Sequence, residues 1–330
     1  MHKLADLPKE LNYRFQPKKK QSKKLSRVYN RIGYDKRSEC VCSCGEFLEV
    51  DVFSDNSARL KRANFCKDFL CPMCAWRKEL KLFDQVSKVV DVLQSQKYRF
   101  LFVTLTIRNV PANGEDLKQV IDEFNKSYTK LIRLKRIKKF LKGAFRSIEV
   151  TYNKDTDEFH PHIHLIWVVP DNYFATSDYL KQAELCELWK KALKVDYTPI
   201  CDIRAVTGKK LVKNGKYITY DLRSAVAEIC KYTVKSNDYL SNTDEKNDKI
   251  VKALVTALSK RHLFEFYGVF SEVRKQLRLD DIENGDLVHI HDDKKDETEL
   301  LYTMVFHWND SNSIYLNTDV WLNGHSRICS

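Results

Sequence analysis

Apolar and polar residues alternate along three segments in the middle of the chain, with the period of two that is typical of half-buried β-strands. These segments are residues 99–107, 144–152 and 160–169. Three other segments have apolar residues at helical spacing and are expected to be helices: residues 115–141, 177–193 and 224–235. A short strand is expected at 198–206. The order βαββαβ, with a trailing helix, predicts an α+β fold whose central antiparallel sheet is ferredoxin-like or RRM-like.

Histidines occupy the polar face of the third of these strands. His162 and His164 share that face, because side chains two residues apart lie on the same side of a strand. A turn near residues 155–156 would bring Glu149 of the preceding strand opposite His162. Two imidazoles and a carboxylate are the donors of a divalent-cation site that leaves positions open for phosphate oxygens. His160 competes with Glu149 for the third ligand position.

The last of the expected helices carries a tyrosine and a carboxylate one turn apart. Ser224 is its candidate N-cap, and Glu228 and Tyr232 are i and i+4 neighbours on its exposed face. A tyrosine can attack a phosphodiester and hold the 5′-phosphate as a covalent ester, and a nearby carboxylate can activate water or a 3′-hydroxyl. Lys231 and Lys235, on the same face, can hold phosphate or assist loss of the phenolic proton.

Six of the ten cysteines lie between positions 40 and 74. In a cytoplasmic protein such clustering favours metal binding over disulfides. Three thiolates of a closed structural zinc site would come from Cys66, Cys71 and Cys74. A fourth would come from one of the three upstream cysteines, Cys40, Cys42 or Cys44. Zinc would stabilise a unit that is too small to fold on apolar burial alone.

Positive charge is concentrated in two places. The chain has 57 Lys and Arg against 45 Asp and Glu, and residues 1–40 hold twelve of the basic residues against four acidic ones. Residues 133–148 add seven basic residues and no acidic one. Localised positive charge attracts a polyanion, and nucleic acid is the usual partner. The candidate DNA contacts are Lys18, Lys19, Lys20, Arg108, Arg133, Lys135, Arg136, Lys138 and Lys139.

The sequence contains no segment that predicts membrane insertion or export. No apolar run reaches the ~18–20 residues of a membrane span. Basic residues interrupt the N-terminal segment where a signal peptide would need an apolar region. We therefore expect a cytoplasmic protein with no membrane partner.

Three motifs follow one another in a defined order along the chain. They are residues 102–109 (FVTLTIRN), 159–165 (FHPHIHL) and 228–235 (EICKYTVK). Together they resemble the motifs of the rolling-circle replication initiators of small bacterial plasmids, in the group that uses one tyrosine and a nearby glutamate. The resemblance covers most of the chain from about Cys44 onward. Because it includes Cys44-Gly45 and residues 66–77, it favours Cys44 as the fourth zinc ligand.

This resemblance implies an HUH endonuclease fold and the nicking of one strand at a plasmid's double-strand origin. Tyr232 would be the nucleophile, and the free 3′-hydroxyl would prime DNA synthesis. His162 and His164 would bind Mn²⁺ or Mg²⁺, and Glu228 would activate water for the terminating cleavage. The implied partners are origin DNA in duplex, single-stranded or hairpin form, a host helicase and a host DNA polymerase. The oligomeric state, including a homodimer, is left open.

Four regions are expected along the chain. Residues 1–37 would form a flexible basic arm, and residues 38–80 a Cys-rich zinc module. Residues 81–245 would form the HUH nicking domain. The remaining C-terminal α/β region, residues 246–330, would bind the origin or contact a partner.

Two alternatives use the same residues differently. An HUH relaxase or transposase would share the chemistry, but relaxases usually carry their nucleophile near the N-terminus, whereas Tyr232 follows the histidines. A non-catalytic, zinc-containing DNA-binding regulator would account for the charge and the cysteines. It would give Glu228 and Tyr232 no reason for their spacing, so the initiator is the favoured interpretation.

Overall fold

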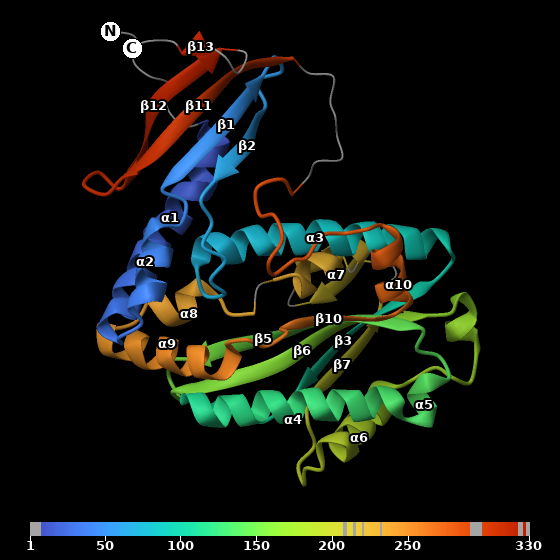
Figure 1. Ribbon diagram of the computed structural model, residues 1–330. Helices are drawn as coiled ribbons and strands as arrows, with labels where there is room; N and C mark the ends of the chain where they lie inside the picture. The colour runs from blue at the N-terminus through green and yellow to red at the C-terminus, as the bar shows by residue number, and fades with distance from the viewer. Residues whose placement is uncertain are drawn as a thin grey trace. The chain divides into compact units, whose positions relative to one another are not determined.

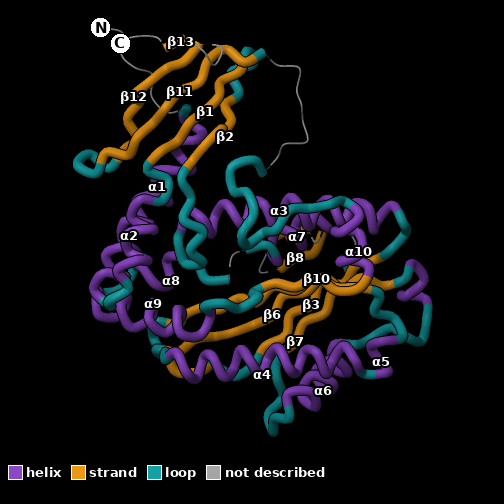
Figure 2. Tube along the Cα trace, viewed as in Figure 1, coloured by secondary structure: helices purple, strands orange, loops and turns teal. Residues whose placement is uncertain are grey.

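The computed structural model describes residues 8–206, 210–213, 216–219, 221–231, 233–290, 299–322 and 326–327. The chain forms two compact units. One unit combines Met1–Lys81 with Asp280–Ser330, and the other is Leu82–Leu279. Figures 1 and 2 show the elements of both units, which are described separately below.

A six-stranded antiparallel sheet is the centre of the unit Leu82–Leu279. Its main path follows the order β10-β5-β6-β3-β7, and β4 pairs with β6 beside it. The strands are β3 (Arg99–Thr106), β4 (Val110–Pro111), β5 (Gly143–Asn153), β6 (Glu158–Val169), β7 (Cys201–Ala205) and β10 (Phe264–Gly268). Without β4 and β10, the remaining order β5-β6-β3-β7 is that of a split βαββαβ arrangement. The predicted α+β fold with an antiparallel sheet is confirmed.

Helices cover both faces of this sheet. Figure 1 shows α4 (Gly114–Arg133) and α6 (Gln182–Leu193) on one side, and α7 (Leu222–Ile229) and α10 (Val269–Gln276) on the other. On the side of α4, Trp167 of β6 is fully buried, as is Trp189 of α6. The unit also contains η1 (Asp171–Ala175), α8 (Ser236–Leu240), α9 (Asp244–Leu258) and a hairpin of β8 (Lys210–Lys213) with β9 (Lys216–Thr219).

The helix predicted at 115–141 is two helices. α4 ends at Arg133 because Leu134 adopts an extended backbone conformation, with φ −61° and ψ 137°. The short helix α5 (Lys135–Lys138) then follows. The side chain of Asn113 caps the N-terminus of α4 by accepting a hydrogen bond from the Asp116 N–H.

The other unit is built on a five-stranded antiparallel sheet of order β13-β12-β11-β1-β2. Its strands are β1 (Phe47–Phe53), β2 (Ala58–Ala63), β11 (Leu300–Asn309), β12 (Ile314–Leu322) and β13 (Ser326–Arg327). β1 alternates between buried and partly exposed residues along its whole length, as a strand with one covered face does. This unit also contains α2 (Asp35–Ser43) and the first turns of α3 (Pro72–Ser95).

The expectation of a flexible basic arm at 1–37 is wrong for its described part. Residues Lys9–Arg31 form the helix α1. One face of α1 is fully buried through Phe15, Leu25 and Tyr29, so apolar burial holds the helix in place despite its many lysines. The sequence does contain the amphipathic pattern of this helix, but its apolar residues are few among many lysines, so the composition of the segment predicts flexibility.

The separate C-terminal region at 246–330 is also not observed. Residues up to Leu279 belong to the unit of the six-stranded sheet, where β10 pairs with β5. Strand β11 instead pairs with β1 of the other unit, with Phe47 opposite His307. Sequence reasoning missed this pairing because the two strands are far apart along the chain. Among the described residues, no helix is long and apolar enough to cross a bilayer.

Candidate active site

Three neighbouring strands bring the predicted metal ligands together. In the register of the sheet, Glu149 of β5 lies opposite His162 of β6, and Thr106 of β3 lies on the other side of His162. His164 lies between Ser147 and Thr104 in the same way. The polar side chains therefore share one face of the sheet, as the alternation of the sequence predicts.

The carboxylate of Glu149 contacts both histidines. Its Oε2 atom lies 2.7 Å from Nε2 of His162 and 2.9 Å from Nε2 of His164. The three side chains are 8–13% exposed, so they are largely shielded from solvent but not completely buried. One donor atom from each residue lies within 4.8 Å of the others, which is close enough for a shared metal ion.

Partners behind the ligands orient them. Nδ1 of His164 lies 3.2 Å from the hydroxyl of Thr104, which turns Nε2 toward Glu149. The second carboxylate oxygen of Glu149 lies 3.1 Å from Nζ of Lys235. Such contacts fix the ring orientation of a metal-binding histidine and the position of a carboxylate. Sequence reasoning missed Thr104 in this role, although its place on the same polar face is a usable signal.

The electrostatics of the site favour an ionised Glu149. Burial by itself would raise the pKa of this carboxyl group. Hydrogen bonds from His162 and His164, with the charge of Lys235, outweigh burial and hold the pKa of Glu149 well below its usual range. The Glu149 charge in turn raises the pKa of Lys235, although burial opposes this change. Glu149 is thus held as a carboxylate, the form that binds a cation.

His160 lies beside this cluster and not within it. Its Nδ1 contacts the side-chain oxygen of Asn109, and its ring centroid lies 5.4 Å from that of His162. Burial lowers the pKa of His160, and the neighbouring His162 adds to this effect. Of the two candidates for the third ligand, the structure brings Glu149 together with His162 and His164.

The helix expected to carry the tyrosine is shorter than predicted. α7 begins at Leu222 and ends at Ile229, with Cys230 as its C-cap. Its N-cap is Asp221, whose carboxylate accepts a hydrogen bond from the N–H of Ser224, so the prediction of Ser224 as N-cap is wrong. α7 therefore ends before position 232, so this helix does not make Glu228 and Tyr232 i,i+4 neighbours.

The chain leaves the helix to run beside β5. Thr233 is buried, and its carbonyl accepts a hydrogen bond of 2.8 Å from the N–H of Val150, next to Glu149. Tyr232 itself lies outside the described residues. Its neighbour Thr233 and the more distant Lys235 both contact the strand that carries Glu149.

The other two residues of the tyrosine motif pair with each other. Nζ of Lys231 forms a salt bridge with the carboxylate of Glu228, and both side chains are close to half exposed. Neither belongs to the metal-capable cluster. Glu228 is thus accessible to solvent, as a residue that activates water must be.

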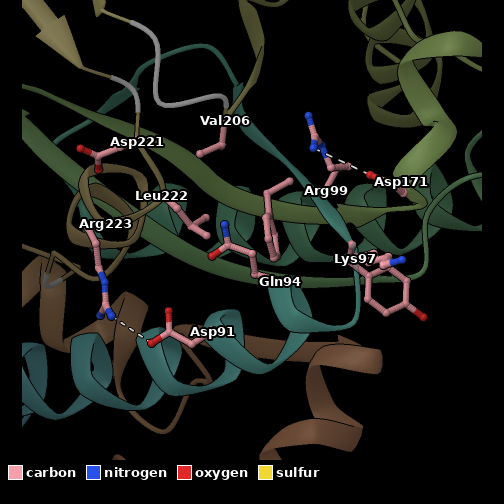
Figure 3. Close-up of a pocket in the computed structure, with 11 residues that line it drawn as sticks. Asp91, Gln94, Lys97, Arg99, Asp171, Val206, Asp221, Leu222 and Arg223 are labelled. Carbon is pink, nitrogen blue, oxygen red and sulfur yellow. Dashed lines mark hydrogen bonds and ion pairs between the residues drawn. The ribbon is translucent and has the colours of Figure 1, made fainter.

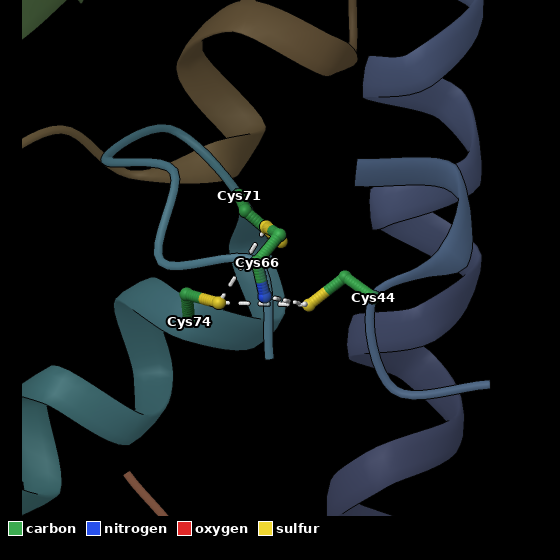
Figure 4. Close-up of side chains that lie close together, drawn as sticks. All are labelled: Cys44, Cys66, Cys71 and Cys74. Atoms are coloured by element: carbon green, nitrogen blue, oxygen red, sulfur yellow. Dashed lines mark hydrogen bonds between the residues drawn. The ribbon is translucent and has the colours of Figure 1, made fainter. Parts of the chain in front are cut away.

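The predicted cysteine cluster is present in the unit of the five-stranded sheet. Cys44, Cys66, Cys71 and Cys74 point toward one another (Figure 4), and their sulfur atoms lie within 4.8 Å of each other. Sγ of Cys74 is 3.5 Å from that of Cys44 and 3.7 Å from that of Cys66. Among the three upstream candidates, Cys44 is the one in the cluster.

Backbone and thiol groups surround these sulfur atoms. The N–H of Cys66 donates to Sγ of Cys44 over 3.4 Å, and the N–H of Lys67 donates to Sγ of Cys74 over 3.2 Å. Hydrogen bonding among the thiols, together with burial, raises the pKa of Cys44 well above its ordinary value. Four sulfur donors gathered around one point form a closed set, which fits a structural metal site whose cation would favour the thiolate form.

Lys19 supports this cluster from α1, so its assignment as a DNA contact is wrong. Its side chain is fully buried, and Nζ donates to the carbonyl oxygens of Cys42 and Cys44 over 2.7 and 2.8 Å. Burial lowers the pKa of Lys19 to about 8. Its neighbour Lys20 is exposed and Lys18 is partly exposed, so both remain candidate DNA contacts.

The basic residues at the end of α4 also divide into two groups. Arg136 forms a salt bridge of 2.6 Å with Glu184 and donates to the carbonyls of Asp178 and Tyr179, so its role is structural. The exposed members are Arg133, Lys135, Lys138 and Lys139. The N–H of Lys142, which follows them in the chain, donates to the carbonyl of Val168 at the end of β6. These basic residues therefore lie near the end of β6 that is remote from His162.

Two pockets lie at opposite ends of β3 in this unit. The first, of 550 Å³, adjoins the start of β3 and is lined by both acidic and basic side chains (Figure 3). Within it, Arg223 pairs with Asp91 over 2.9 Å, and Arg99 lies 3.8 Å from Asp171. The second, of 440 Å³, adjoins the end of β3 and includes His160. Its position beside the histidines makes it part of the candidate site.

Comparison with known proteins identifies the family. The sequence profile of a family described as replication protein matches residues 57–316. The chain belongs to this replication protein family. The matched range of this replication protein includes Glu149, His162, His164 and Glu228, whereas Cys44 lies before it. No solved structure is significantly similar to the chain.

Individual relatives match this replication protein over most of their own length. A protein named "Protein rep" from Streptococcus pneumoniae serotype 2 (strain D39 / NCTC 7466) is 38% identical over 299 residues, which cover 89% of this chain and 88% of the relative. A "Protein rep" from Bacillus sp is 41% identical over 267 residues, which cover 78% of this chain and 86% of the relative. A "Protein rep" from Bacillus amyloliquefaciens is 38% identical over 300 residues, covering 87% of each.

Proposed function

We propose that this replication protein initiates rolling-circle replication of a bacterial plasmid by nicking one strand at the double-strand origin. The observation that carries the proposal is the Glu149 carboxylate, 2.7 and 2.9 Å from two histidines on the polar face of the sheet. Family membership and the motif around Tyr232 support it. The βαββαβ sheet with this histidine strand is the arrangement expected of an HUH endonuclease.

The proposed reaction is a transesterification at phosphorus. The Oη atom of Tyr232 attacks the scissile phosphate, a bond forms between Oη and phosphorus, and the bond from phosphorus to the 3′-oxygen breaks. The phenolic proton passes to solvent or a nearby base, and the leaving 3′-oxygen takes up a proton to become the priming hydroxyl. Lys235 and Lys231, at the end of the same motif, would hold the phosphate or ease ionisation of the phenol.

Glu228 would act in the second cleavage, which ends replication. Its carboxylate would take a proton from water, so that this water, and not a second tyrosine, attacks phosphorus. The partly exposed side chain and its salt bridge with Lys231 are compatible with that role. A single tyrosine would then suffice for one round.

His162, His164 and Glu149 would hold a divalent cation. When bound, this ion would polarise the scissile phosphate and stabilise charge that develops on its oxygens. Two imidazole nitrogens and one carboxylate suit Mn²⁺ better than Mg²⁺, which prefers oxygen ligands throughout. The four clustered thiols would hold Zn²⁺, since a closed set of sulfur donors is the usual environment of structural zinc.

The proposed partners follow from the reaction. The origin would be bound as duplex, hairpin or single strand, with Arg108, Lys18, Lys20 and the exposed basic residues near α5 as phosphate contacts. A host helicase would unwind the duplex, and a host polymerase would extend the nicked strand. We further propose that the unit containing the cysteine cluster and the five-stranded sheet recognises the origin, and that Leu82–Leu279 cleaves it.

A plasmid-relaxation assay tests this function. Supercoiled plasmid that carries the protein's origin is incubated with full-length protein and Mn²⁺ or Mg²⁺. We expect open circles only when both the metal and the origin are present, and no product from His162→Ala. Relaxation that is unaffected by chelation or by His162→Ala would contradict the proposal. Binding to duplex DNA without any nick would favour a non-catalytic regulator.

A further inference from the structure

The pocket at the end of β3 continues outward from the metal-capable cluster. It is formed by the residues that follow β3, the start of β6 and the loop that precedes β7. His160 forms part of its wall, and the ring of His160 lies 5.4 Å from that of His162. A DNA strand whose phosphate lay at His162 and His164 would therefore pass a neighbouring nucleotide over this pocket. Its volume of 440 Å³ falls in the range of about 300–1,000 Å³ that small-ligand pockets occupy.

A stacked pair of side chains supplies the positive charge of the pocket. The guanidinium of Arg108 lies 4.3 Å from the ring centroid of Tyr197, and the backbone N–H of Arg108 donates to the Tyr197 hydroxyl over 3.0 Å. Arg108 is exposed. In the described part of the chain, no carboxylate forms a salt bridge with it. A cation held flat on an aromatic ring and left without an acidic partner is suited to a phosphate or to a nucleobase.

The remaining walls combine an apolar surface with hydrogen-bonding groups. Ile200 is 75% exposed and gives the pocket an apolar surface. Glu158 presents a carboxylate, one oxygen of which accepts a hydrogen bond of 3.2 Å from the Asn109 amide. A carboxylate accepts hydrogen bonds from an exocyclic amino group of a base, such as N4 of cytosine. Thymine has no such group.

We propose that this pocket binds the nucleotide adjacent to the scissile phosphate and favours a base that carries an exocyclic amino group. Arg108 contacts the phosphate, Tyr197 and Ile200 contact the base, and Glu158 accepts from its amino group. This inference rests on the proposed nicking function, because that function places single-stranded DNA at the histidines. It assigns a selective contact to residues that flank the chemistry without taking part in it.

Fluorescence anisotropy with short single strands tests the proposal. The probes are fluorescein-labelled hexanucleotides of deoxycytidine and of thymidine. All variants are made in full-length protein that also carries Tyr232→Phe, so that cleavage cannot compete with binding. Stacking of one base on an aromatic side chain accounts for at least about a fivefold change in affinity. We therefore expect Tyr197→Ala to weaken binding of both probes about fivefold or more, and Tyr197→Phe to stay within about twofold of the parent.

Further variants separate the roles of the other residues. Arg108→Gln should reduce the slope of log affinity against log salt by about 0.7, the amount expected for one lost phosphate contact on a single strand. Glu158→Ala should abolish the preference for the deoxycytidine probe. Tyr179→Ala, which removes another exposed tyrosine of the same unit, is the matched control and should leave binding unchanged. Circular dichroism of each variant establishes that it is folded.

The outcomes distinguish this inference from the function on which it rests. If Tyr197→Ala and Arg108→Gln both bind the deoxycytidine probe within about twofold of the parent, the pocket assignment is overturned, whatever the nicking assay shows. If these variants lose binding but the wild-type protein nicks no DNA with any metal, the proposed function fails and the nucleotide-binding pocket stands. Equal affinity of the parent for both probes would overturn the base preference.

Discussion

Glu149 and His162 face each other across the pair β5–β6, with Oε2 of the glutamate 2.7 Å from Nε2 of the histidine. The same oxygen reaches His164, while Lys235 contacts the other oxygen. One carboxylate thus joins two imidazoles and a lysine from a later segment of the chain. Changes at Glu149 should therefore affect metal binding more than folding.

Replacing Glu149 with glutamine should weaken Mn²⁺ binding at least about tenfold, since even the partners behind a metal ligand contribute about that much. The amide keeps the size of the side chain but lacks the charge that attracts the cation. Isothermal titration of full-length protein with Mn²⁺ measures the effect. Glu187→Gln, on the exposed face of α6, is the matched control and should bind as the wild type does. Unchanged affinity in Glu149→Gln would exclude this residue as a ligand.

Replacing Cys74 with serine should remove the metal from the thiol cluster and destabilise its unit by several kcal/mol, since metal binding to such sites is coupled to folding. Cobalt substitution reports on this site separately from the histidines, because tetrahedral cobalt bound by thiolates has its own visible absorption. We expect that absorption in the wild type and in Cys40→Ser, whose cysteine is exposed and outside the cluster. Its persistence in Cys74→Ser would show that the four thiols do not bind metal together.

Lys19→Met should lower the free energy of unfolding by about 1–3 kcal/mol, because it leaves one buried and one partly buried carbonyl group without their donor. Lys20→Met, at the exposed neighbouring position, should change it by no more than about 0.5 kcal/mol. Urea denaturation of the two variants makes the comparison. Equal stabilities would mean that the Lys19 hydrogen bonds contribute little to this part of the protein.

The pair Asp122–Arg261 provides a pH-dependent test of the unit Leu82–Leu279. The hydrogen bond from Arg261 holds the pKa of Asp122 below its usual range. A carboxylate with a lowered pKa contributes stability that is present above its unfolded-state pKa and is lost as the pH falls through its folded-state pKa. Asp122→Asn should therefore lower the melting temperature at neutral pH, and the difference from wild type should disappear in acid. A difference that is independent of pH would contradict this assignment.

Local pattern is enough to predict the metal-capable cluster. Period-two alternation and a short turn between two adjacent strands determine which residues face each other, and for these two strands they place Glu149 opposite His162. The identity of the fourth thiol does not follow from spacing, since Cys40, Cys42 and Cys44 are all close enough along the chain. The fold decides in favour of Cys44.

Features that depend on segments far apart along the chain cannot be predicted from local sequence patterns. Strands β1 and β11 pair although more than half of the chain separates them, and nothing local in either strand specifies its partner. Lys19 is expected to be a DNA contact because lysine is rarely buried, yet two carbonyl groups satisfy its ammonium. The end of α7 is hard to predict because Thr233 fits a helical wheel, whereas its carbonyl in fact accepts a hydrogen bond from Val150 of β5.

Covalent capture of the cleaved strand is the most direct test of the central claim. A labelled single strand that spans the origin is incubated with full-length protein and Mn²⁺, and the protein–DNA adduct is digested and mapped by mass spectrometry. We predict a 5′-phosphate ester on Tyr232 that forms in the wild type and is absent from Tyr232→Phe and from His162→Ala. An adduct that persists in Tyr232→Phe, or a wild-type protein that cleaves the strand without any adduct, would contradict the account.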